Sequence, residues 1–87
     1  MNDLERQTLA KVRGLASANR IIFTAHAIIR MNERNVLRRD VHRALSGGRE
    51  CKDRRDGTFR VTGKDFDGDD LTCAVAIDTS ISVITVF

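Results

Sequence analysis

The 87-residue sequence contains no proline, tryptophan or tyrosine, and only two cysteines and four phenylalanines. It also lacks linkers of low complexity and internal repeats, so we expect one domain over residues 1–87. No apolar run approaches the roughly 20 residues that cross a bilayer, and the N-terminus has no signal-peptide core. We therefore expect no membrane association and a cytoplasmic location. The scarcity of aromatic residues argues against the base-stacking platform that is common in RNA-binding proteins.

The two cysteines, Cys51 and Cys73, lack the C-x-x-C spacing of redox and zinc motifs, so we expect reduced thiols. A zinc site formed by these cysteines with His26 and His42 fits no usual ligand spacing, and we expect neither a metal nor another cofactor. The sequence also has no glycine-rich phosphate loop, no pair of catalytic carboxylates and no context for a serine nucleophile. These absences argue against the common hydrolase and nucleotide-binding classes.

Positive charge is concentrated in the middle of the chain. Residues 20–64 hold twelve basic and five acidic side chains, whereas residues 65–78 hold five aspartates and no basic residue. A basic segment followed by an acidic loop favours anionic partners. A charged, solvated surface is the alternative that charge alone leaves open.

The first half of the chain is predicted to be mainly helical. An amphipathic helix occupies most of residues 1–19, with Asn2 as its N-cap and Glu5 at the capping-box position. Within residues 20–48 a short apolar strand is followed by two helices, the first capped by Thr24. The apolar positions of the leading helix are Leu4, Leu9, Val12 and Ala16.

The junction between the two short helices has two distinctive residues. Asn35 is suited to the left-handed backbone conformation that ends a helix. Leu37, the expected N-cap of the next helix, offers no side-chain acceptor, which is a defect of about 1 kcal/mol relative to serine or threonine. Asp40 in the first turn can offset part of that defect.

Residues 49–87 alternate in hydrophobicity, which predicts an antiparallel meander of about four strands. Asp56–Gly57 and Asp67–Gly68 are hairpin signals, and Thr79–Ser80 makes a third turn. The last two strands should be neighbours inside the sheet. With the helices on one face of this sheet, the expected fold class is α+β.

One helical face carries a candidate catalytic group, formed by His26, Arg30 and Arg34 at intervals of four residues. RNA cleavage without a metal requires a base for the 2′-hydroxyl, an acid for the 5′-oxygen and cations for the charge on phosphorus. We expect His26 to act as acid and base, and Arg30 with Arg34 to hold the phosphate. The alternatives are that His26 bonds a backbone carbonyl, that Arg30 pairs with Glu33 or Glu50, and that Arg34 is merely solvated.

A second group of basic residues lies on the following helix and on one predicted strand. From their side-chain types we expect them to contact phosphate groups, and such contacts position a nucleic acid without selecting its sequence. The candidate RNA-binding residues are Arg38, Arg39, His42, Arg43, Arg60 and Lys64.

Residues 20–87 also resemble a known family. The shared pattern is Thr24-x-His26-Ala27-x-x-Arg30-Met31-x-x-Arg34, then Asp40-Val41-x-x-Ala44-Leu45-x-x-Gly48, and finally Val83-Ile84-Thr85-Val86-Phe87. It is similar to the largely bacterial family known as domain of unknown function 4258, which resembles the RelE/ParE toxins. The chain departs from relatives at Asn35-Val36, where Gly-Ile is usual, at Leu37, where a capping serine or threonine is usual, and at Phe87, where tyrosine is frequent.

The resemblance implies a RelE/ParE-like fold and the toxin component of a type II toxin-antitoxin system. A metal-independent mRNA endonuclease is the first function that it implies. The alternative is a non-catalytic binding module that docks an antitoxin or DNA gyrase through its basic face. Expected partners are a co-encoded antitoxin, which is MqsA-like beside some relatives, and RNA, either free or on the ribosome. The family has no established set of catalytic residues, so the site residues above are assigned only from the chemistry of their side chains.

Overall fold

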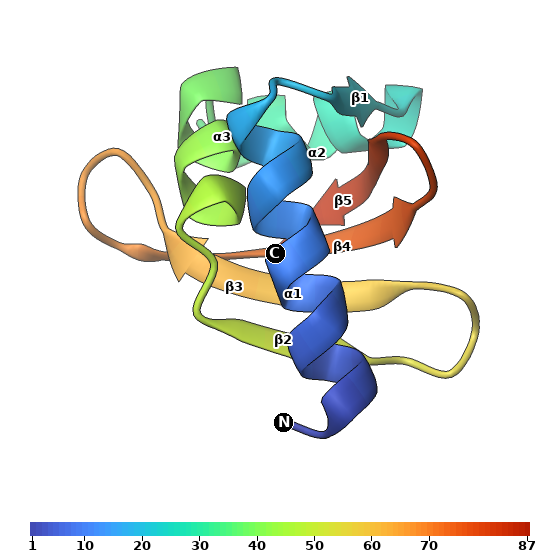
Figure 1. Ribbon diagram of the computed structural model, residues 1–87. Coiled ribbons are helices and arrows are strands. Elements are labelled where there is room, and N and C mark those ends of the chain that lie inside the picture. Colours follow the sequence, from blue (N-terminus) through green and yellow to red (C-terminus); the bar gives the residue numbers. More distant parts are fainter.

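The computed structural model describes all 87 residues and contains three helices and one five-stranded sheet (Figure 1). The elements in chain order are α1 (Asp3–Ser17), β1 (Ile21–Phe23), α2 (Ala25–Glu33), α3 (Arg38–Ser46), β2 (Glu50–Asp53), β3 (Phe59–Lys64), β4 (Asp70–Ile77) and β5 (Ile81–Val86). The predicted α+β fold and its order of elements are confirmed. None of the helices combines the length and the apolar character needed to cross a membrane.

The strands lie in the order β1-β5-β4-β3-β2. Strands β2 to β5 form the predicted antiparallel meander, in which β4 and β5 are neighbours. Gly57 and Gly68 in its hairpin loops have φ angles of 88° and 87°, the left-handed conformation that glycine adopts without strain. Strand β1 adds to β5 in parallel and pairs Ile21 with Ile81. The last strand of the chain is therefore an inner strand of the sheet.

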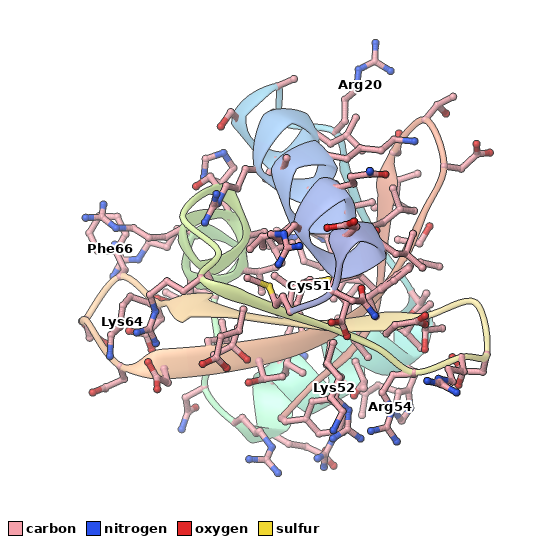
Figure 2. All side chains as sticks on the ribbon, turned by 60° about the horizontal axis from the view of Figure 1, so that its bottom comes forward. Arg20, Cys51, Lys52, Arg54, Lys64 and Phe66 are labelled. Atoms are coloured by element: carbon pink, nitrogen blue, oxygen red, sulfur yellow. The ribbon has the colours of Figure 1, made fainter.

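Helices α1 and α3 pack together on one side of the sheet, whereas α2 lies against β5 on the other side (Figures 1 and 2). The expectation that all helices cover one face is therefore wrong for α2. Leu4 is also exposed rather than buried, because the first turn of α1 reaches the outer edge of β2 and has no further strand to pack on. The core between α1, α3 and the sheet includes Val12, Leu45 and Val75, all fully buried.

The helix ends follow the predicted capping chemistry. Asn2 and Glu5 form a reciprocal capping box, with both hydrogen bonds 2.8 Å long. The hydroxyl of Thr24 accepts the backbone N–H of Ala27 at 3.0 Å and so caps α2. Asn35 has a φ of 55° just beyond α2, as expected for a left-handed helix terminator.

Helix α3 approaches β3 closely at Gly63. A Cβ atom at this position would lie 2.0 Å from the carbonyl oxygen of Ala44, far inside van der Waals contact. The absence of a side chain at Gly63 therefore allows α3 to pack directly on the strand backbone. This contact places the exposed face of α3 beside Lys64, the last residue of β3.

Candidate functional site

A shallow hollow of about 550 Å³ opens between α3, the end of β3 and the loop that follows β3. Four of the six predicted RNA-binding residues line it, together with one phenylalanine and small residues from the ends of α1 and α3. The lining residues are Ser17, Arg39, His42, Arg43, Ser46, Gly47, Lys64 and Phe66. We call this feature the α3–β3 hollow, and Figure 2 shows Phe66 and Lys64 together at this end of the molecule.

Helical spacing explains why α3 presents a histidine and two arginines to the hollow. Arg39, His42 and Arg43 are three and four residues apart and therefore share one face of the helix. Val41 and Leu45 lie on the opposite face and are fully buried. The apolar face thus fixes the rotation of α3, and that rotation brings the three polar side chains to the hollow.

Phe66 brings an aromatic ring to the same place from the loop between β3 and β4. The guanidinium carbons of Arg39 and Arg43 lie 4.6 Å and 5.0 Å from the centre of its ring, within cation–π range. The residue is nevertheless 50% exposed. Sequence reasoning missed Phe66, although an aromatic residue in a loop otherwise made of aspartate and glycine was the available signal.

Asp40 connects the Phe66 loop to the start of α3. One carboxylate oxygen accepts the backbone N–H of Leu37 at 2.9 Å, and the other accepts the backbone N–H of Phe66 at 3.1 Å. Asp40 is only 8% exposed, and both hydrogen bonds are partly buried. The bond from Leu37 is consistent with the expectation that Asp40 offsets part of the missing cap, and the bond from Phe66 is an additional role that the sequence did not indicate.

The cations of the hollow differ in their ion pairs. Lys64 lies 2.7 Å from a carboxylate oxygen of Asp70, which is also 2.6 Å from Arg49. The hydrogen bond from Lys64 holds the pKa of Asp70 below its ordinary value. Arg39 and Arg43 have no carboxylate partner. Their positive charges are consequently available to an anionic ligand.

His26 and Arg30 of the predicted catalytic group lie on α2, and Arg34 is the C-cap residue that follows this helix. None of the three lines the α3–β3 hollow. His26 is exposed in the first turn of α2, and its side chain makes no hydrogen bond to a backbone carbonyl. Arg30 pairs with Glu33 at 3.3 Å, which is one of the alternatives that the sequence left open. Arg34 is exposed and has no ion pair.

Two of the predicted RNA-binding residues also lie outside the hollow. Arg38 is placed over the ring of Phe23, with 4.9 Å between its guanidinium carbon and the ring centre. Arg60 lies over Phe87 at 4.3 Å and lines a separate hollow of about 600 Å³ beside β2. The structure therefore separates the six predicted RNA-binding residues, and four of them lie together at the α3–β3 hollow.

The two cysteines are unsuited to nucleophilic chemistry. Both are buried, and burial raises the pKa of Cys51 to about 11 and that of Cys73 to about 12. No group of three or more histidine, cysteine, aspartate or glutamate side chains is arranged to hold a metal ion. The chemistry that the hollow can supply is that of an imidazole beside fixed cations.

A comparison with models of protein families matches residues 23–87 to the family described as Domain of unknown function (DUF4258). No curated protein and no solved structure matches the chain. The matched residues run from the end of β1 through β5 and include the whole of α3 and the Phe66 loop.

Proposed function

The chain belongs to the family of domain of unknown function 4258, and on this basis we propose that it is a RelE/ParE-like toxin of a type II toxin-antitoxin system that acts on RNA. The observation that carries the RNA part is the α3–β3 hollow. There Arg39 and Arg43, which have no carboxylate partner, lie beside His42 and an exposed aromatic ring. Guanidinium groups are well suited to phosphate oxygens.

The hollow supports cleavage by the 2′-hydroxyl of the RNA itself. His42 takes the proton of that hydroxyl, and the 2′-oxygen then attacks the adjacent phosphorus. The bond from phosphorus to the 5′-oxygen breaks, which leaves a 2′,3′-cyclic phosphate, and the departing 5′-oxygen takes a proton from water. Arg39 and Arg43 stabilise the negative charge that develops on the phosphate oxygens.

The geometry favours His42 over His26 as the proton-transfer group. His42 shares a hollow with Arg39, Arg43 and Lys64, whereas the arginine nearest to His26 on the same helical face is paired with Glu33. The assignment of catalysis to His26, Arg30 and Arg34 stays a prediction from the sequence. One experiment compares the two histidines directly.

That experiment incubates RNA with wild-type protein, His42→Ala and His26→Ala, with and without ribosomes. We expect His42→Ala to slow cleavage by about 10²- to 10⁴-fold, the usual contribution of a general acid-base group. His26→Ala should cleave like the wild type and serves as the matched control. If His26→Ala slows cleavage and His42→Ala does not, the catalytic histidine lies on α2. Intact RNA with wild-type protein in both assays would rule out the endonuclease and leave the non-catalytic binding module.

Phosphate binding by the hollow has its own test. Replacing Arg39 and Arg43 together by alanine should weaken RNA binding and reduce the dependence of affinity on salt, because fewer counterions are released. The charge-matched control replaces Arg30 and Arg34, which removes the same charge from α2 and its C-cap. Equal losses in both double variants would show that net charge, and not the hollow, determines binding.

The toxin role requires growth arrest on expression and its relief by a co-encoded protein. Exposed apolar side chains support a protein partner, since Ile22, Ile29 and Leu37 are each more than half exposed. We expect the chain and the co-encoded antitoxin to elute as one complex in size-exclusion chromatography. The toxin role is contradicted if the chain forms no complex with any product of the neighbouring genes and its expression does not arrest growth. Growth arrest with intact RNA would favour docking to DNA gyrase.

A further inference from the structure

Phe66 gives the α3–β3 hollow a feature that its charge does not explain. We propose that the Phe66 ring stacks on one unpaired base of a single-stranded nucleic acid, and that Asp40 is the positioning residue that holds the ring in place. This inference rests on the proposed function and specifies the form of nucleic acid that the hollow accepts. It predicts a preference for single strands over duplexes.

The burial of Phe66 differs from that of the phenylalanines that pack on the core. Phe23 and Phe59 are partly buried against the hydrophobic cluster, whereas Phe66 lies outside that cluster and is 50% exposed. Its ring contacts the charged ends of Arg39 and Arg43. Since Phe66 adds little to the core and half of the residue is exposed, the part of its ring that the guanidinium groups leave uncovered remains available to a flat apolar ligand.

The loop that carries Phe66 is held at several points. The buried carboxylate of Asp40 accepts the backbone N–H of Phe66. Within the loop, the Asp65 carboxylate accepts the N–H groups of Asp67 and Asp69, both at 2.9 Å, and the Asp65 N–H donates to the Asp69 carbonyl at 2.8 Å. A ring that is ordered before binding loses less conformational entropy when a ligand stacks on it.

An aromatic ring flanked by two guanidinium groups matches the chemistry of a single strand. An unpaired base has a free π-face that can stack on Phe66, while Arg39 and Arg43 are near enough to hold the adjoining phosphates. In a duplex each base is stacked and paired, so the ring has no base to contact without unstacking it. Stacking does not involve the 2′-hydroxyl. Single-stranded DNA should therefore bind as single-stranded RNA does. It should not be cleaved, because it lacks the 2′-hydroxyl that attacks the phosphorus.

The test uses the full chain and single-stranded DNA that carries the fluorescent base 2-aminopurine, with the matched duplex as a second probe. Wild-type protein should bind the single strand more tightly than the duplex and should change the 2-aminopurine fluorescence. Phe66→Leu keeps an apolar side chain but removes the ring, and should weaken single-strand binding by about tenfold. The salt dependence should stay unchanged, because no phosphate contact is lost. Phe66→Trp should restore both affinity and fluorescence change.

Two further variants separate stacking and positioning from general effects. Phe87→Leu is the matched control, since Phe87 is 41% exposed and also lies against an arginine, but it is outside the hollow. It should bind like the wild type. Asp40→Asn should weaken single-strand binding with an unchanged salt dependence, as Phe66→Leu does, while a structural role alone would leave the affinity of the folded protein unchanged.

The outcomes distinguish this inference from the proposed function. If Phe66→Leu binds the single strand as tightly as wild type, or if wild type binds the duplex equally well, stacking is wrong although RNA cleavage can still stand. If wild type binds and stacks on single-stranded DNA but leaves RNA intact, stacking stands and the endonuclease is wrong. If wild type binds neither probe, the inference fails, and the RNA cleavage assay decides the proposed function separately.

Discussion

Asp40 accepts two backbone hydrogen bonds, one from Leu37 in its own helix cap and one from Phe66, 26 residues away. In Asp40→Asn the amide keeps one acceptor oxygen and turns a donor toward the other N–H group. We expect the free energy of unfolding to fall by about 1–3 kcal/mol, the usual cost of an unsatisfied buried group. Urea denaturation measures this loss of stability. Asp78→Asn, at an exposed position, should change stability by less than about 0.5 kcal/mol. Equal stability of both variants would contradict the role of Asp40.

The thiols of Cys51 and Cys73 should be unreactive in the folded protein. Because burial raises their pKa values to about 11 and about 12, almost none of either thiol is ionised at pH 8, and the thiolate is the reactive form. A colourimetric thiol reagent should therefore modify neither cysteine in the native chain and both after denaturation. Modification of the native protein at the rate of a free cysteine would show that one thiol is accessible and ionised.

At the scale of elements, the packing of α3 on β3 depends on Gly63. In Gly63→Ala the new methyl group meets the backbone of Ala44, which cannot rotate away. We expect a loss of about 1–3 kcal/mol or more in the free energy of unfolding, as in other overpacked cores. Gly14→Ala is the matched control, because Gly14 is in α1 with nothing within 4 Å of the added Cβ. It should stabilise the protein by about 1 kcal/mol, since alanine favours the helix.

The start of α1 also protects the edge strand β2. The Glu5 carboxylate accepts the N–H of Asp53 at 2.8 Å, in addition to its bond within the capping box, and these hydrogen bonds lower its pKa below the ordinary 4.5. The unfolded chain therefore takes up this proton at a higher pH than the folded chain. The stabilisation by Glu5 is complete above pH 4.5 and is lost as the pH falls through the folded pKa.

Urea denaturation across this pH range tests the role of Glu5. We expect the wild type to lose more stability than Glu5→Gln as the pH falls below 4.5, because the glutamine variant cannot take up the proton. Above pH 4.5 the wild type should be the more stable protein. Parallel pH profiles for the two proteins would show that the Glu5 hydrogen bonds do not depend on its charge.

At the scale of the whole molecule, α1 lies outside the residues that match the family, yet it supplies part of the core. Leu9, Val12 and Ala16 are buried against the rest of the chain. A chain of residues 20–87 would expose the surface that they cover. We expect it to show no cooperative thermal transition by circular dichroism, whereas the full chain should. A transition of the short chain within a few degrees of that of the full chain would contradict this prediction.

The sequence by itself determined the features that depend on neighbouring residues. The caps at Asn2 and Thr24, the helix end at Asn35 and the hairpin turns at Gly57 and Gly68 are all confirmed. Each depends on the conformational preferences of one residue and on hydrogen bonds that reach only a few positions along the chain. Alternating hydrophobicity was sufficient for the meander, because it shows which side of each strand is buried.

Only the tertiary structure decided which distant segments meet. Periodicity predicts that a face is buried but not what covers it, so the parallel pairing of β1 with β5 and the position of α2 across the sheet were not predicted. The Thr24 hydroxyl donates a hydrogen bond to the carbonyl oxygen of Ile84, 60 residues away in the sequence. The candidate site has the same origin: helical spacing aligned Arg39 with Arg43, but Phe66 joins them only because the fold brings the β3–β4 loop to α3 and a buried Asp40 holds it there.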